Sequence, residues 1–283
     1  MKYLISAILF LLGVSTFAQK RINPDFLNHL MNTEHYREVV YLIDKADFNN
    51  LDKNLIDSLN YMKGWSLYSQ KKLSRSANVL QKVSMSSPFY LKSHFFSAYN
   101  FLYQGNNKAA FNILDTLYID NTKLNSLRHF EKAGINLMNR NYKKFNKEFA
   151  KVDTTYYPLA EESVKINQYA TDLKNHQKKS PVLAGFMSSI IPGSGRIYAG
   201  ETGEGISSLL TVGGLGFVTW ENYNKKGPRH FKTLFFGTIF TAFYIGNIYG
   251  TVFSVKIAED EFQKEYDNKI LFNLHIPLRN VFN

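Results

Sequence analysis

The segment from Pro192 to Gly200 has residue types that could do chemistry, because a serine lies between closely spaced glycines. A hydrolase nucleophile occupies such a turn as G-x-S-x-G after a strand, but Pro192-Gly193-Ser194-Gly195 is one residue short and follows no strand pattern. The glycines also lack a surrounding βαβ unit and a following Gly-Lys-Ser or Gly-Lys-Thr, which nucleotide loops require. We therefore interpret the segment as a tight turn that binds no nucleotide.

No other group of residues forms a catalytic or metal-binding pattern. The 7 histidines include no HExxH spacing, and the chain contains no cysteine, which excludes disulfides, thiolate metal ligands and a cysteine nucleophile. Two acidic clusters, Glu161-Glu162 and Glu259-Asp260-Glu261, are explained by solvated helix faces more simply than by acid–base catalysis. We expect a protein that is not an enzyme, with no cofactor, metal or small-molecule substrate.

Composition divides the chain near residue 180. The chain has 283 residues, a hydrophobic content of 45% and a formal net charge of +11. Charged residues are frequent up to Lys179, whereas residues 181–255 are rich in Gly, Ile, Leu and Phe. A basic chain suits nucleic acid or an anionic lipid surface, but these lysines form no stripe with interleaved aromatic residues. We therefore expect a lipid bilayer, and no nucleic acid, among its partners.

Residues 1–18 have the pattern of a secretory signal peptide. A basic start precedes an apolar run from Leu4 to Val14, and Thr16 and Ala18 are the small residues of a cleavage site before Gln19. The sequence therefore predicts an exported protein whose mature chain starts at Gln19. An uncleaved anchor helix is the alternative.

Residues 19–157 repeat weakly, with a period near 35 residues. Each repeat has a polar turn between two amphipathic helical patterns, and these turns begin at Glu34, Lys71, Gly105 and Arg140. Small residues recur at the same interval, since Gly64 and Ala98 are 34 positions apart. The pattern predicts an array of helix pairs.

The second of these units resembles the tetratricopeptide repeat family. Its Trp65, Tyr68, Ala77 and Pro88 fall close to the aromatic, small and proline positions of a 34-residue repeat. The resemblance implies stacked helix pairs with a concave groove that binds a protein or peptide. A generic solenoid of helical hairpins is the alternative. Residues 158–179 then form a polar helix that either caps the array or links it to the next domain.

Residues 180–256 contain two glycine-rich motifs. The first, P-G-S-G-R-I-Y-A-G, follows S-P-V-L-A-G, and the second is Y-I-G-N-I-Y-G. They resemble the P-G-x-G-Q-x-Y-x-G and Y-x-G-N-x-Y-G motifs of small bacterial membrane domains, which implies a helical membrane domain without a defined activity. Arg196 stands at the position of the glutamine. The motif residues are Pro192, Gly193, Gly195, Tyr198, Gly200, Gly246, Asn247, Tyr249 and Gly250.

Hydropathy predicts a transmembrane hairpin in this domain. Phe231 to Val255 is apolar and long enough to cross a hydrocarbon core of about 30 Å, and Ile206 to Trp220 is a shorter second segment. The loop between them carries four basic residues and one acid, which the positive-inside rule places in the cytoplasm. The repeats then lie in the periplasm, next to the bacterial inner membrane. Pro181 to Tyr198 is either an interfacial segment or a third span that inverts this orientation.

A stripe of small residues recurs every four positions in the longer apolar segment, at Thr238, Ala242, Gly246, Gly250 and Ser254. Small side chains let another helix approach closely, so we expect the stripe to pack against Ile206 to Trp220. Asn247 lies beside the stripe. It either makes a hydrogen bond between those two helices or belongs to a functional site.

The C-terminal residues 257–283 have two patterns. Ile257 to Asp267 predicts an exposed helix, and the alternation from Ile270 to Ile276 predicts a short strand before Pro277. No function follows from them.

Together these patterns predict an all-α protein, with a TPR-like helix-pair solenoid followed by a helical transmembrane hairpin. We expect a membrane-anchored adaptor or scaffold whose repeats bind another envelope protein. The alternative is an accessory component of an envelope transport or membrane-protein insertion machine that acts through the membrane domain.

Overall fold

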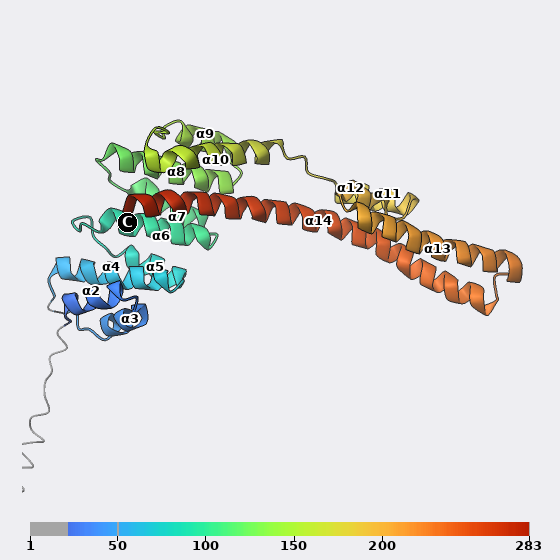
Figure 1. Cartoon of the computed structure of the whole chain (residues 1–283), viewed down its shortest axis with the longest axis horizontal. Coiled ribbons are helices and arrows are strands. Elements are labelled where there is room, and N and C mark those ends of the chain that lie inside the picture. Colours follow the sequence, from blue (N-terminus) through green and yellow to red (C-terminus); the bar gives the residue numbers. More distant parts are fainter. Residues whose placement is uncertain (1–21, 50, 283) are drawn as a thin grey trace, which may run out of the picture. The chain divides into compact units, whose positions relative to one another are not determined.

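The computed structural model describes residues 22–49 and 51–282, and in that part of the chain every regular element is a helix (Figure 1). The predicted all-α fold class is confirmed at this level. The predicted signal peptide lies outside the described residues. The chain divides into two compact units: residues up to Gln168 together with those from Ile270 onward, and residues Tyr169–Lys269.

The first unit consists of helices that pack in sequence order, each against the next. They are α2 (Pro24–Asn32), α3 (Tyr36–Asp44), α4 (Lys53–Ser69), α5 (Leu73–Leu80), α6 (Tyr90–Tyr103), α7 (Asn107–Thr116), α8 (Thr122–Met138), α9 (Tyr142–Phe149) and the first part of α10 (Tyr157–Asn175). Helices α2 and α3, α4 and α5, α6 and α7, and α8 and α9 form consecutive pairs. Short polar caps start several of them; Asn121, for example, accepts the backbone N–H groups of Lys123 and Leu124.

The turn inside each pair has one shared geometry. Its first residue is left-handed, with φ of 60° at Glu34, 59° at Lys71, 77° at Gly105 and 54° at Arg140. The next residue donates its N–H to the carbonyl five residues back, at 2.8–2.9 Å, in His35 to Leu30, Lys72 to Leu67, Asn106 to Phe101 and Asn141 to Asn136. This Schellman ending satisfies a carbonyl that the helix leaves free. The four predicted turns are therefore equivalent, as the repeat pattern indicated.

Apolar side chains from both helices of each pair form the core of the first unit. Gly64 of α4 lets α5 approach closely, because a Cβ at residue 64 would lie 2.5 Å from Leu80 Cδ2. Fully buried side chains include Leu59, Leu67, Phe95, Phe96, Leu114, Phe130 and Phe145. Burial of each such side chain contributes about 1.5–3 kcal/mol to folding, so the array is held mainly by these contacts.

The second unit contains α11 (Pro181–Ile190), α12 (Ser194–Ala199), α13 (Thr202–Lys226) and most of α14 (Phe231–Phe282). Helices α13 and α14 are joined by a short turn, and a Cβ at Gly216 of α13 would lie 3.1 Å from Phe240 of α14. Among the described residues, α14 is the one helix that is long and apolar enough to cross a membrane, and α11 is a shorter apolar helix.

The end of α10 also packs within the second unit. His176, just after this helix, contacts Glu259 of α14 through Nε2 at 2.8 Å and stacks on Phe262 with ring centroids 3.7 Å apart. Tyr266 of α14 donates its hydroxyl to Asp172 at 3.1 Å. The predicted polar helix therefore contributes residues to both units.

The strand predicted from Ile270 to Ile276 is wrong, because α14 continues to Phe282 with Pro277 inside it. A strand would bury Ile270, Phe272 and Leu274 on one face, but Phe272 is 68% exposed. The buried side chains are Ile270, Leu271, Leu274 and Leu278. This is the spacing of one helical face, and the surface that covers it belongs to the helix array.

Candidate functional site

The C-terminal part of α14, residues 270–282, lies against the first helices of the pairs and is called the tail helix below. Its Leu274 packs on Gly134 of α8, where an added Cβ would lie 2.4 Å from Leu274 Cδ2. Its Phe282 packs against Phe95 of α6, with ring centroids 5.4 Å apart. The tail helix therefore completes the core of the first unit.

His275 lies at the centre of this contact. Its ring stacks on Tyr99 of α6 with centroids 4.7 Å apart, and its Nε2 makes a short hydrogen bond with the hydroxyl of Tyr68 on α4. Burial lowers the pKa of His275, and the nearby charge of Arg279 lowers it further. The imidazole is therefore held neutral, and its Nε2 accepts a hydrogen bond from the Tyr68 hydroxyl.

A second polar contact holds the tail helix against α10. The amide of Asn273 donates to the carboxylate of Glu162, and both side chains are almost completely buried. Glu162 also pairs with Lys165 at 3.1 Å. The sequence placed Glu162 on a solvated face, which is wrong, because the tail helix covers it.

A surface of the first unit is thus covered by a segment of the same chain. Contacts of the tail helix come from α4, α6, α8 and α10, all in the first unit. Sequence reasoning missed this segment because its pairs with the array are separated by 111 residues for Glu162 and 207 residues for Tyr68. The available signal was the helical spacing of Ile270, Leu274 and Leu278.

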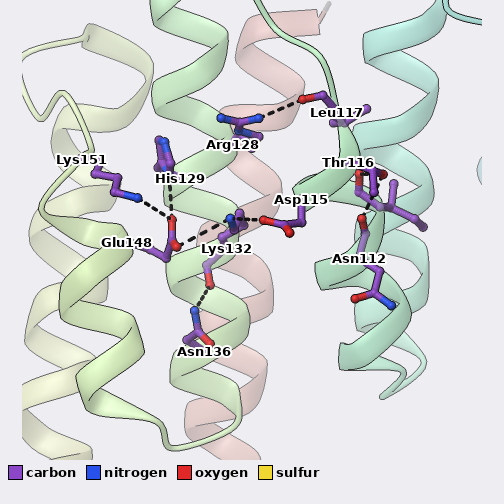
Figure 2. A network of polar contacts seen from close by, with 11 residues as sticks. Asn112, Asp115, Thr116, Leu117, Arg128, His129, Lys132, Asn136, Glu148 and Lys151 are labelled. Carbon is purple, nitrogen blue, oxygen red and sulfur yellow. Dashed lines mark hydrogen bonds and ion pairs between the residues drawn. The ribbon is translucent and has the colours of Figure 1, made fainter.

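A buried ion-pair network joins α7, α8 and α9 (Figure 2). At its centre the carboxylate of Glu148 lies 2.7 Å from His129 Nδ1 and 3.6 Å from Lys132 Nζ. Lys132 also reaches Asp115 of α7 at 2.6 Å. The network links three consecutive helices, which explains its place inside the array.

The charges of this network balance one another. Burial raises the pKa of Glu148, but the hydrogen bond from His129 and the charges of Lys132 and Lys151 outweigh it and leave the pKa below its ordinary value. Burial lowers the pKa of His129, and with the charges of Lys151 and Arg128 it keeps that pKa below its ordinary value although Glu148 raises it. Glu148 is thus an anion beside a neutral imidazole, and the group links the three helices.

Glu131 is a separate buried acid on α8. It is 2% exposed, and its Oε1 has no hydrogen-bond partner among the described residues. Burial raises its pKa well above the ordinary value, which favours the protonated carboxyl. The sequence did not single it out, because nothing in the local pattern distinguishes it from an exposed helical glutamate.

The first glycine-rich motif forms a close crossing of backbone segments in the second unit. A Cβ on Gly193 would lie 2.0 Å from the carbonyl oxygen of Gly205, and one on Gly195 would lie 2.0 Å from that of Ala184. Gly193 and Gly200 also have φ of 83° and 104°, which favours glycine. These glycines are required for packing. Ser194 donates its hydroxyl to the Ile191 carbonyl at 2.8 Å, as expected of a turn.

Ser188 of α11 connects the two motifs. Its hydroxyl accepts the Gly195 N–H at 3.1 Å and lies 3.0 Å from the Thr251 hydroxyl. Its carbonyl accepts the amide of Asn247 at 3.4 Å. The structure thus brings together the loop of the first motif and the helix of the second, through a serine that the sequence did not single out.

The remaining motif residues have different surroundings. Tyr198 accepts the Ser180 N–H at 3.1 Å, which closes the loop before α11. Pro192 is half-buried in the turn before α12, and Tyr249 is exposed. Neither brings a polar group to the loop.

At Gly246 and Gly250 the small-residue stripe does not contact α13 as predicted. A Cβ at Gly246 would have no atom within 4 Å, and one at Gly250 would lie 2.9 Å from the Arg196 guanidinium of α12. Asn247 likewise bonds to α11 and not to a hydroxyl of α13. The side chain of Arg196, and not that helix, lies beside Gly250.

No group of three or more His, Asp or Glu side chains gathers as metal ligands within residues 22–49 and 51–282. Comparison with protein-family models, with curated proteins and with solved structures finds no match for this chain. The functional argument therefore rests on the contacts described above.

Proposed function

We propose that this protein is a membrane-anchored helical-repeat adaptor that binds another envelope protein and catalyses no reaction. One observation carries the proposal: helix α14 contains both the apolar segment and the tail helix that completes the array. The apolar segment and the tail helix are therefore parts of one continuous helix. Such a chain holds a recognition surface at a membrane.

The exposed apolar surface of the second unit supports the anchor. Only 17% of the apolar window of α14 is buried, whereas a core helix of a water-soluble domain is mostly buried. Large apolar side chains with roughly half or more of their surface exposed are Leu210, Phe217, Trp220, Phe235, Phe243, Ile245, Tyr249 and Phe253. A bilayer would cover them.

The basic turn between α13 and α14 supports the orientation. Lys225, Lys226, Arg229 and Lys232 lie at this end of the hairpin. Basic loops are retained in the cytoplasm. The array, which is formed by the segments before and after the hairpin, therefore lies in the periplasm, beside the inner membrane.

Among the described residues, a candidate partner surface lies on the first helix pair. Between α2 and α3 lies a cavity of about 450 Å³, lined mostly by apolar side chains and by Lys45. Phe26 and Tyr41 border it and are 51% and 62% exposed. An apolar side chain flanked by an acidic group fits this site, since Lys45 supplies the charge. The partner is thus an envelope protein with an acidic, apolar contact segment.

Site-specific photocrosslinking in native envelopes tests this proposal. A photoreactive amino acid at Tyr41 should give one discrete crosslinked protein, and the same residue at Tyr118 should not. Tyr118 is a matched control, because it is 60% exposed and lies elsewhere on the array. Equal or absent crosslinking at both positions would contradict an adaptor that uses the first helix pair.

A further inference from the structure

A polar pocket lies between α12, α13 and α14 in the second unit. Its volume is about 420 Å³, and its polar lining consists of the guanidinium of Arg196, the hydroxyls of Ser207, Ser208 and Thr211, and the amide of Asn247. Gly246 also lines it and leaves it open, since a Cβ there would meet no atom within 4 Å. This is an unusual concentration of hydrogen-bonding groups among the exposed apolar side chains of the hairpin.

We propose that this pocket binds the phosphoethanolamine head group of a membrane phospholipid. The proposal rests on the proposed function, because it requires the hairpin to lie in a bilayer. It goes further by naming the chemical class of a ligand and the residues that bind it.

Two polar atoms at the pocket lack partners. The Nε of Arg196 and the Oδ1 of Asn247 are buried and have no hydrogen-bond partner among the described residues. Asn247 is 6% exposed. Burying such a group without a partner costs about 1–3 kcal/mol, so a ligand gains free energy here if it offers an acceptor to the Arg196 Nε and an N–H donor to the Asn247 Oδ1.

The depth of the pocket fits a head group. Helix α13 begins at Thr202, and Ser207 and Thr211 lie about 8 and 14 Å along it at 1.5 Å per residue. The polar layer on each side of the hydrocarbon core is about 5–7 Å thick. With the start of α13 placed at the membrane surface, the Ser207 hydroxyl lies near the boundary where phospholipid phosphates and glycerol esters meet the hydrocarbon, and the Thr211 hydroxyl lies deeper.

Electrostatics selects a zwitterion. Arg196 donates from Nη1 to the carboxylate of Glu204, so the site presents a cation and an anion side by side with no net charge. A phosphate pairs with Arg196 and the hydroxyls, and an ammonium pairs with Glu204, whose side chain is 64% exposed. Choline has no N–H to donate, and phosphatidylglycerol has no cation for Glu204. Phosphoethanolamine supplies both charges.

Arg196 makes this selection specific to the chain. The resembled motif has glutamine at this position, which brings no charge and cannot bind a phosphate as an ion pair. The substitution places a guanidinium at the pocket and a partner carboxylate eight residues away. The charge pair is therefore a feature of this sequence, beyond the shared motif.

The test uses the full chain in phosphatidylcholine vesicles that contain photoactivatable phosphatidylethanolamine or photoactivatable phosphatidylglycerol. Labelled peptides are mapped by mass spectrometry. The phosphatidylethanolamine probe should label peptides around Ser207 and Asn247. Gly246→Leu fills open space without a clash, and Arg196→Gln removes the charge. Each should reduce labelling about tenfold, the effect of one charge-assisted hydrogen bond.

Gly213→Leu is the matched control, because Gly213 is also a helical glycine with no atom within 4 Å of its Cβ position and does not line the pocket. It should label like the unchanged chain. Equal labelling by both probes, or undiminished labelling of Gly246→Leu, would overturn the head-group site while leaving the membrane anchor intact. Saturable binding of soluble glycerophosphoethanolamine without any lipid labelling would overturn the lipid source. A chain that fails to float with the vesicles would overturn the proposed function as well.

Discussion

Leu274 of the tail helix occupies the space above Gly134 of α8, where an added Cβ would lie 2.4 Å from Leu274 Cδ2. Leu274 is fully buried, although 140 residues separate the two positions. The C-terminal end of the chain is therefore a structural part of the helix array. A partner that binds the first helices of the pairs would have to displace it.

The contact between Leu274 and Gly134 predicts coupled mutational effects. Leu274→Ala should lower the free energy of unfolding by about 2–5 kcal/mol, because it leaves a cavity in a packed core. Gly134→Ala should also destabilise the array, since its methyl group collides with the leucine. The double variant should be more stable than the sum of the two effects predicts, as measured by chemical denaturation of the full chain in detergent. Strictly additive effects would show that the two residues do not touch in solution.

His275 predicts a loss of stability as pH falls. Burial and Arg279 lower its pKa in the folded chain, so its contribution is complete above the unfolded value of about 6.5 and is lost as the pH falls below that value. The urea midpoint of the unchanged chain should therefore fall from pH 7 to pH 5. His275→Gln should show a shallower fall over the same range. The comparison is needed because His94 and His129 also have lowered pKa values and act in the same direction. Identical pH dependence in the two proteins would show that His275 does not contribute to the loss of stability in acid.

Glu131 should give the opposite dependence of folding stability on pH. Its raised pKa means that the unfolded chain loses this proton above pH of about 4.5 while the folded chain keeps it, so stability falls as pH rises. Glu131→Gln removes that penalty and should be more stable than the unchanged chain at pH 8, with the difference vanishing near pH 4. Glu148→Gln is the matched control. The pKa of Glu148 is lowered, so this variant should be less stable at pH 7 and approach the unchanged chain in acid. A Glu131→Gln variant with a constant stability difference at every pH would contradict a protonated Glu131.

The glycine crossing in the second unit predicts a sharp difference between two alanine variants. Gly195→Ala places a methyl group 2.0 Å from the Ala184 carbonyl oxygen, and backbone cannot move aside as a side chain can. Gly246→Ala meets no atom within 4 Å. Limited proteolysis in detergent should cut the 181–255 region of the first variant rapidly and leave the second as resistant as the unchanged chain. Equal resistance would show that the crossing is not tightly packed.

Local sequence predicted the helix pairs well, for a physical reason. Each pair ends its first helix with a left-handed residue such as Lys71 or Gly105, and in two pairs an asparagine, Asn106 or Asn141, then caps the second helix. The apolar segment of α14 is similarly local, because length and hydropathy alone mark it.

Long-range contacts were not predictable in the same way. The alternation after Ile270 indicated a strand. The segment is a helix instead, and its face with Leu274 is buried because α8 and α10 pack against it. The stripe at Gly250 indicated packing on α13, but the guanidinium of Arg196 lies beside it. Both outcomes depend on which distant segment of the chain packs against these residues, and the spacing of residues in the sequence does not specify that contact.

Membrane topology tests the central claim most directly, and the chain suits the measurement because it contains no cysteine. Single cysteines at the exposed Tyr118 and at Lys226 would be treated with a membrane-impermeant maleimide in cells with a permeable outer membrane. The account predicts labelling at residue 118, no labelling at residue 226 until the inner membrane is lysed, and retention of both variants in the membrane pellet after carbonate extraction. Labelling at residue 226 in intact cells, or release of the chain into the carbonate supernatant, would contradict it.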